Sequence, residues 1–190
     1  MRYVFILIPL LAGSPAMAQD FKRIEPSASA LVVTIPALKD AKPTFFDRAE
    51  GEPAKGEVPA VPTTDKAGYA GGGMLGVFWY EFVDGPAKWR DAGLRAVVED
   101  LDWIADKNLV FGRTEQPYFR GNAEGTYRLF AYRPQNAERP CVVGQYARSG
   151  QQVSERVTLI VCKPAGTQMD PAEARKLVDG VGTKTLPPAM

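Results

Sequence analysis

PCVVGQYARSGQQVSERVTLIVCK, residues 140–163, is the stretch that decides the fold. Two runs rich in Val and Ile flank a polar, glycine-containing turn at 148–152, which is the pattern of a β-hairpin. When the turn is centred near residues 150–152, Cys141 lies opposite Cys162 on the neighbouring strand. The stretch therefore predicts an antiparallel hairpin with its two cysteines side by side.

The same register predicts the neighbours of the cysteines. Val143 faces Ile160 on the cysteine side of the hairpin, and Tyr146 faces Val157 on the other side. Because the side-chain period of a strand is two, a slip of one residue would exchange the faces.

Cys141 and Cys162 are the only cysteines of the chain, and we predict that they form a disulfide. Closing a loop of this length stabilises a fold by about 3 kcal/mol in the chain-entropy model. The alternative, a redox-active pair, usually has the close Cys-x-x-Cys spacing beside a helix start. Two cysteines without histidine make a poor metal site, so we expect no metal.

The first residues predict export. Arg2 precedes an apolar run from Tyr3 to Ala12, and Ala16-Met17-Ala18 supplies small residues at the cleavage positions. This is the pattern of a secretory signal peptide over residues 1–18, cleaved after Ala18. The run is about half of the ~20 residues that a membrane-spanning helix needs. We therefore expect a mature chain without a membrane span, in the periplasm or secreted.

Charge and composition exclude several classes of function. The chain carries 23 Lys and Arg against 22 Asp and Glu, whereas nucleic-acid binding needs a basic surplus, so we expect no nucleic-acid partner. It contains no histidine, which removes Ser-His-Asp and Cys-His catalysis and the commonest metal ligand. The sequence indicates no cofactor.

Three further segments complete the expected fold. Residues 126–132 alternate as a strand, so that with the hairpin they form a meander of three strands. Residues 86–107 read as a long amphipathic helix that Pro86 opens. A short C-terminal helix begins at Pro171, with Asp170 as its N-cap and Glu173 completing a capping box. The predicted fold class is α+β: a small antiparallel sheet, a meander with a disulfide-linked hairpin, packed by one long helix and one short C-terminal helix.

The expected domain organisation follows from the distribution of proline. Residues 19–66 are rich in Pro and Ala, which predicts a partly disordered segment with an edge strand at 30–35 and a mobile loop or linker at 40–65. Residues 67–182 form the α+β domain. Residues 183–190 are expected to be a flexible tail.

Two groups of side chains are candidates for binding. Arginine is frequent after residue 113, and its planar fork suits carboxylates and phosphates. The alternative is a solvated face that specifies no partner. Trp89 and Trp103 lie at the edge of the expected long helix, where they form an aromatic rim or serve in packing. The candidate anion or partner surface consists of Arg128, Arg133, Arg139, Arg148 and Arg156.

The C-terminal third resembles a group of small exported bacterial proteins of unknown function. The likeness rests on Cys141-Val142-Val143, on Cys162-Lys163-Pro164-Ala165-Gly166 and on the capped helix after Met169. These proteins share a cysteine in one strand, a cysteine before a Pro-x-Gly turn in the next, and a short helix. The resemblance implies an envelope location and a disulfide, and it implies no reaction.

We expect an exported periplasmic or secreted, non-catalytic module that binds a protein or envelope component, with the oligomeric state open. One alternative is a carboxylate-dependent hydrolase or lyase of the cell envelope. Another is an enzyme inhibitor or chaperone-like envelope protein. For the hydrolase or lyase, the available acids are Glu81, Asp84, Asp100 and Asp102, and two of them would have to converge in a cleft.

Overall fold

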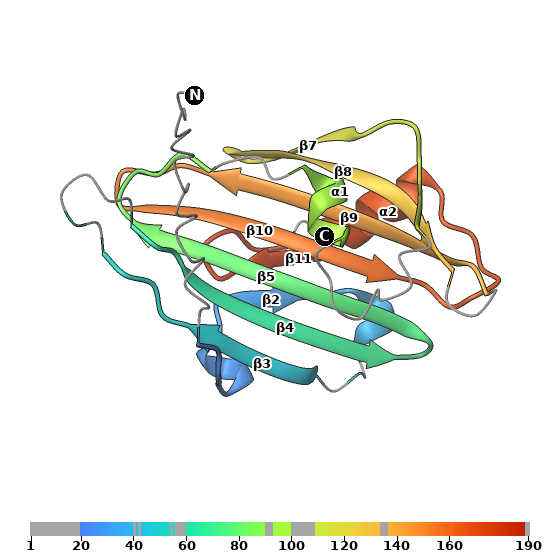
Figure 1. The fold of residues 1–190 in the computed structure, drawn as a ribbon, viewed down its shortest axis with the longest axis horizontal. Coiled ribbons are helices and arrows are strands. Elements are labelled where there is room, and N and C mark those ends of the chain that lie inside the picture. Colours follow the sequence, from blue (N-terminus) through green and yellow to red (C-terminus); the bar gives the residue numbers. More distant parts are fainter. Residues whose placement is uncertain are drawn as a thin grey trace, which may run out of the picture.

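The computed structural model describes residues 20–39, 41, 43–53, 55, 60–89, 93–99, 109–133 and 137–188. Within these ranges, nine strands form one antiparallel sheet in the order β1-β3-β4-β5-β10-β9-β8-β6, and β7 also pairs with β8 (Figure 1). The strands are β1 Lys22–Arg23, β3 Pro43–Ala49, β4 Thr63–Gly71, β5 Met74–Asp84, β6 Leu109–Phe111, β7 Gln116–Arg120, β8 Ala123–Tyr132, β9 Arg139–Arg148 and β10 Val153–Cys162.

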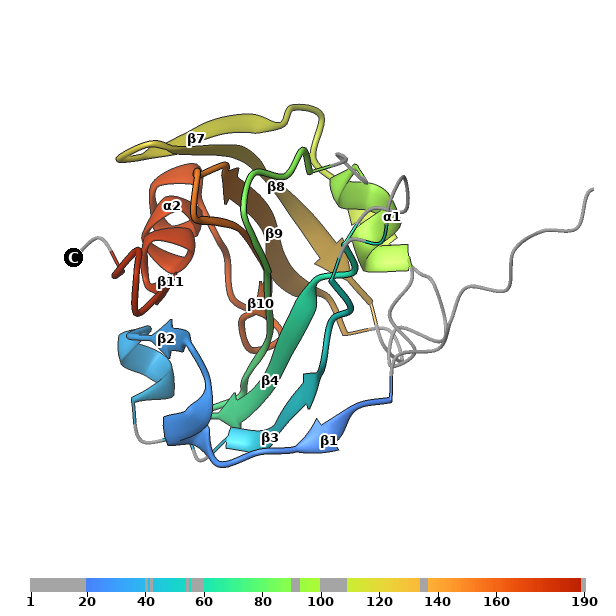
Figure 2. The same cartoon turned by 90° about the vertical axis from the view of Figure 1, so that its left-hand side faces the viewer.

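A short ribbon and the helices cover the faces of this sheet. The ribbon pairs β2 (Leu31–Val33) with β11 (Val181–Thr183). The helices are α1 (Leu94–Glu99) and α2 (Pro171–Asp179), and η1 (Pro26–Ala28) and η2 (Pro36–Leu38) are single 3₁₀ turns. The sheet bends around α2, β2 and β11, and α1 lies on its opposite side (Figure 2). We call the face that carries α2 the inner face and the face that carries α1 the outer face.

The hairpin prediction is confirmed. Cys141 pairs with Cys162, Val143 with Ile160 and Tyr146 with Val157, and a disulfide joins the two cysteines. The meander of β8, β9 and β10 is confirmed as well. The reason is that the β9–β10 turn sets the pairing of the two strands that flank it.

The predicted α+β fold class is wrong, because the sheet is far larger than expected and no long helix was found among the described residues. Part of the error is the expected helix at 86–107. Residues Pro86–Trp89 are not helical, and α1 begins only at Leu94. The backbone N–H of Ala87 donates to the hydroxyl of Ser154 at 2.8 Å, which ties this segment to β10. Residues 100–108 lie outside the described part.

The rest of the error lies before residue 72. The stretch 40–65, expected as a loop or linker, contains β3 and the start of β4. Pro43 is the first residue of β3, a position at which a strand can hold a proline. Pro53 and Pro62 lie between the two strands. Phe46 on β3 is buried in the main core. Proline content therefore misled the prediction, because the strands use the residues between the prolines.

The short ribbon also differs from the expectation. The strand expected at 30–35 exists as β2, but it pairs with β11 rather than with the edge of the main sheet. Beyond β11, the segment expected as a loose tail turns back. The N–H of Lys184 donates to the carbonyl of Ala30 at 3.0 Å, and the N–H of Thr183 donates to Leu186 at 2.9 Å.

Two apolar clusters hold the layers together. On the inner face, Phe78, Leu159 and Val142 pack with Leu177 and Val178 of α2 and with residues of the ribbon. On the outer face, Leu94 and Val98 of α1 cover a cluster formed by the disulfide together with Phe130, Val143 and Ile160. The disulfide is therefore part of the outer core and is buried.

The start of α2 agrees with the prediction. Asp170 Oδ1 accepts a hydrogen bond from the N–H of Glu173 at 2.8 Å, and Pro171 follows at the first helical position. The Glu173 carboxylate pairs with Lys163 at 2.6 Å.

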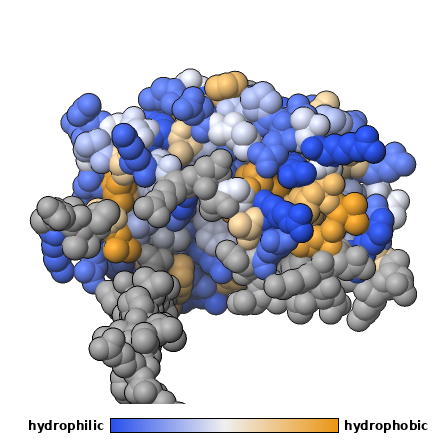
Figure 3. Space-filling view, turned by 45° about the horizontal axis from the view of Figure 1, so that its top comes forward, coloured by the Kyte–Doolittle hydropathy of each residue, from blue (hydrophilic) through white to orange (hydrophobic). Residues whose placement is uncertain are grey.

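In the coloured part of the surface in Figure 3, hydrophilic side chains surround several smaller hydrophobic patches. In the described part of the chain, helices fall short of the length and apolar character that crossing a bilayer requires.

Candidate functional site

Several of the loops that connect the strands lie together at one end of the sheet. The β3–β4 connection, the last residue of β5 and the β9–β10 turn meet there, because Asp84 pairs with Val153 and Thr63 with Phe82 (left-hand end of Figure 1). The β7–β8 turn, at Gly121, joins them at the same end. We call this part the loop end.

A row of inner-face residues borders the loop end. Across four adjacent strands, Thr63, Phe82, Glu155 and Arg148 are successive partners. The strand period of two places all of them on the inner face. The row combines an aromatic ring with a buried ion pair.

Glu155 is the centre of a buried polar cluster. It is 2% exposed and pairs with Arg148. The hydroxyl of Tyr80 donates to Glu155 Oε2 at 3.0 Å, and that of Thr185 donates to the same oxygen at 2.8 Å. Burial, reinforced by the negative charge of Glu155, raises the pKa of Tyr80. The Glu155 carboxylate is therefore held in place by Arg148, Tyr80 and Thr185.

Asp65 is a second buried carboxylate on the same face. Its oxygens accept from Arg48 Nε at 2.6 Å, from the hydroxyl of Ser29 at 2.8 Å and from the N–H of Ala30 at 3.1 Å. The hydrogen bond to Asp65 raises the pKa of Arg48. Asp65 thus fastens the segment before β2 to the sheet.

Arg120 supplies buried positive charge near the end of β7. It is 9% exposed and donates to the carbonyl of Val181 at 2.7 Å, to that of Leu186 at 3.3 Å and to the hydroxyl of Tyr146. These partners, all in the described part of the chain, are neutral, and the Nε atom of Arg120 forms no hydrogen bond there. Burial raises the pKa of Tyr146, and Arg120 works against that rise.

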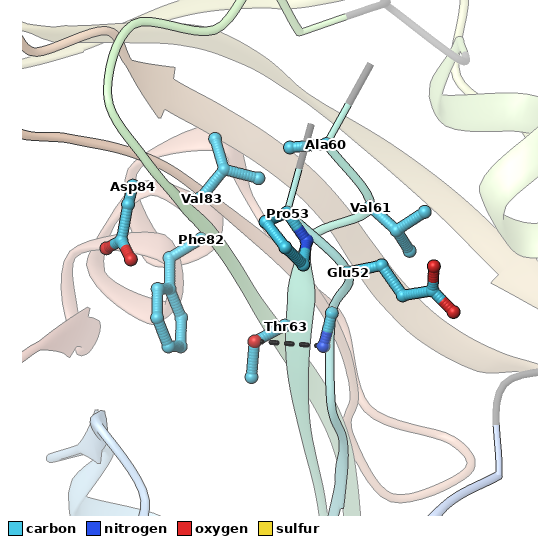
Figure 4. Close-up of a pocket in the computed structure, with 9 residues that line it drawn as sticks. Glu52, Pro53, Ala60, Val61, Thr63, Phe82, Val83 and Asp84 are labelled. Atoms are coloured by element: carbon cyan, nitrogen blue, oxygen red, sulfur yellow. Dashed lines mark hydrogen bonds between the residues drawn. The ribbon is translucent and has the colours of Figure 1, made fainter. Parts of the chain in front are cut away.

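Two recesses flank the row at the loop end. One, of about 470 Å³, lies between the β7–β8 and β9–β10 turns. Its lining is Asn122, Arg148, Gly150, Gln151, Gln152, Val153 and Thr185. The other, of about 370 Å³, lies beside the end of β5 (Figure 4), where the hydroxyl of Thr63 accepts from the N–H of Gly51 at 3.0 Å. Its lining includes Phe82, Val83 and Asp84.

A third recess, of about 270 Å³, lies on the outer face away from this row. Phe45, Ala70, Leu75 and Val77 line it, so that its walls are apolar. Nothing in the structure shows what would cover it.

The arginines predicted as a binding surface do not share one face. Arg148 lies on the inner face with Glu155. Arg156 lies on the outer face, where it binds Glu81 through two nitrogens at 2.6 and 2.8 Å and covers the ring of Trp89.

The remaining three arginines are bonded at separate places. Arg128 donates to the carbonyl of Gly112 at 2.8 Å. Arg139 donates to the carbonyl of Gly73 at 2.9 Å. Arg133 pairs with Glu138 at 2.7 Å. Anion binding by the whole set stays a prediction, and Arg148 is its member at the loop end.

The predicted aromatic rim and carboxylates are only partly described. Trp89 packs against Arg156, and Trp103 lies outside the described residues, as do Asp100 and Asp102. Glu81 is held by Arg156 on the outer face, whereas Asp84 lines the recess beside the end of β5. The structure therefore does not bring these two acids together.

Sequence reasoning missed Glu155, Asp65 and Arg120. A signal for Glu155 was present, because the alternation that turns Val157 and Leu159 inward also turns Glu155 inward. Asp65 lies in a stretch that was expected to be a loop. The inward position of Arg120 depends on β7, which the sequence did not predict.

Comparisons with known proteins add no identification. No family model, no curated protein and no solved structure matches this chain. The resemblance to small exported two-cysteine proteins therefore stays a prediction, of which the structure contains the disulfide-linked hairpin and the capped helix.

Proposed function

We propose that this protein is an exported, non-catalytic module that binds a protein or other envelope component through its loop end. The observation that carries the proposal is the ion pair between the buried Glu155 and the partly exposed Arg148, at the border of the recess between the β7–β8 and β9–β10 turns. Buried ion pairs contribute little net stability, so a rigid, polar site at a surface recess suits recognition. Binding residues are often carried by loops that a rigid scaffold positions.

The state of the carboxylates favours binding over acid–base catalysis. Glu155, Asp65 and Glu81 each pair with an arginine. Each of these carboxylates is therefore already engaged by a cation of the protein, whereas a general acid or base must lie within hydrogen-bond reach of the substrate proton. The hydrolase or lyase alternative requires two cooperating carboxyl groups, and nothing in the described part favours such a pair.

Export is supported by two independent features. The first 18 residues have the pattern of a cleaved signal peptide. The disulfide between Cys141 and Cys162 is the kind of bond that persists in oxidising compartments. Mass spectrometry of the protein from its native host should find a chain that begins at Gln19 with no free thiol; a chain that retains Met1 would contradict export.

Site-specific crosslinking tests the binding surface. A photoreactive residue at Gln151, in the β9–β10 turn, is compared with one at Gln168, an exposed glutamine beyond the opposite end of β10. In intact cells the Gln151 position should give a discrete crosslinked product, and the Gln168 position should not. Equal products at both positions, or products at Gln168 alone, would contradict binding at the loop end.

A further inference from the structure

We propose that the recess between the β7–β8 and β9–β10 turns binds a small polar organic carboxylate, with Arg148 as the residue that bonds the carboxylate. This inference rests on the proposed function and names the ligand class for the loop end. The recess has a volume of about 470 Å³, within the range of ligand sites. That size suits a single sugar acid or the last residues of a peptide.

Arg148 is positioned as a donor to such a ligand. Its Nε pairs with the buried Glu155, whereas its side chain stays 23% exposed and lines the recess. Within the described part of the chain, no hydrogen bond is formed by its two terminal nitrogens. A guanidinium offers five N–H donors in a fixed planar fork, and bidentate pairing with a carboxylate is its strongest mode.

Glu155 prepares this arginine for binding. Tyr80 and Thr185 hold the other carboxylate oxygen, Oε2, and the ion pair restrains the Arg148 guanidinium beside the recess. Less side-chain entropy is then lost when a ligand binds, which raises affinity.

The surrounding charge favours an anion. Among the described residues, the lining of the recess contains Arg148 and no acidic side chain. Arg120 adds a buried positive charge whose described partners are neutral, and one of them is the carbonyl of Leu186, next to Thr185 in the lining. Beside the recess, the two positive charges of Arg148 and Arg120 therefore oppose the negative charge of Glu155.

The remaining lining selects a polar ligand. Asn122, Gln151 and Gln152 present amide groups, each of which can donate and accept hydrogen bonds. Hydroxyl groups of a sugar or peptide groups of a chain end are suitable partners, whereas a fatty acid would find few apolar contacts here. The shared chemistry of a sugar acid and a peptide end is a carboxylate beside polar groups.

Titrations monitored by NMR test the assignment with matched probes. D-glucuronate is compared with D-glucose, and N-acetyl-alanyl-alanine with its C-terminal amide, on the disulfide-bonded protein. At least one carboxylate should shift the backbone amide signals of residues 150–153 saturably and bind about tenfold or more tightly than its neutral counterpart, as expected for a charge-assisted hydrogen bond. Which carboxylate binds distinguishes a sugar acid from a peptide end.

Two variants separate ligand binding from folding. Arg148→Gln alone leaves the Glu155 carboxylate buried without its cation, so the test uses the double variant Arg148→Gln/Glu155→Gln, which removes both charges together. It should lose binding by about tenfold or more. Asn122→Ala, at the rim, leaves the pair intact and should weaken binding by a smaller factor.

The outcomes are distinct. Equal affinity for a carboxylate and its neutral counterpart, or unchanged affinity in the double variant, overturns the assignment. If no carboxylate binds but Gln151 still crosslinks a partner in cells, the ligand class is wrong and the proposed function stands. If neither occurs, both proposals fail.

Discussion

Removing either member of the Arg148–Glu155 pair should destabilise the fold, and removing both should cost less than the sum. Arg148→Gln leaves a carboxylate that is 2% exposed with neutral partners, so we expect a loss of about 3 kcal/mol in the free energy of unfolding. Glu155→Gln leaves an arginine whose side chain is 23% exposed. Partial solvation of that cation reduces the expected loss to about 2 kcal/mol.

The double variant is the informative one. Two glutamines can bond to each other and to Tyr80 and Thr185, so the combined loss should be about 2 kcal/mol. The coupling between the two positions is then about 3 kcal/mol, at the upper end for residues in direct contact. Urea unfolding followed by circular dichroism gives the four free energies, with unchanged slopes showing that the unfolded state is the same.

A second Arg–Glu pair in the same chain provides the control. Arg95 and Glu99 on α1 lie 2.7 Å apart with side chains 69% and 40% exposed. Their substitution by glutamine should change stability by about 0.5 kcal/mol or less, because water already solvates both charges. If the coupling for Arg148 and Glu155 is no larger than for this exposed pair, the reasoning from burial is refuted.

Three further measurements test other parts of the fold. Replacing Cys141 and Cys162 by alanine opens a link between residues 21 apart and should lower the free energy of unfolding by about 3 kcal/mol in urea titrations; a loss below about 1 kcal/mol would contradict the loop-closure argument. Burial raises the pKa of Tyr118 to about 12; above pH ~10 the unfolded chain releases that proton and the folded chain keeps it, so this tyrosine should contribute a fall in stability of about 1.4 kcal/mol per pH unit between pH ~10 and ~12, in addition to the contributions of Tyr80 and Tyr146. Tyr118→Phe should flatten the fall. Asp170→Ala removes the N-cap of α2 and should cost about 1 kcal/mol in thermal unfolding, whereas Asp170→Asn should cost less; equal losses would argue against the cap.

The sequence predicted those elements whose signals are local. The turn at 148–152 and the Val- and Ile-rich runs on either side of it predicted the register of β9 and β10 and placed Cys141 beside Cys162. Asp170 and Pro171 identified the start of α2. In each case neighbouring residues carry the whole signal, because a turn or a cap forms within a few positions of the chain.

The sequence misjudged segments whose structure depends on distant partners. β3 forms because β4 pairs with it, and Phe46 gains its burial from the inner core. Residues 86–89 lie beside the start of β10 instead of forming a helix, because the N–H of Ala87 donates to the hydroxyl of Ser154. Apolar periodicity and proline content cannot report such long-range hydrogen bonds.

The candidate site divides in the same way. From the sequence alone come the predicted export, the disulfide and Arg148 as one of several arginines that could bind an anion. Only the tertiary structure pairs Arg148 with Glu155 and brings the hydroxyl of Thr185 to the same carboxylate. It also places Arg120 against the carbonyl of Leu186, the residue that follows Thr185. These residues come from four separate segments, which the packing of the ribbon on the bent sheet brings together. A buried charged group has no water to solvate it, so its partners are the groups that the fold places beside it.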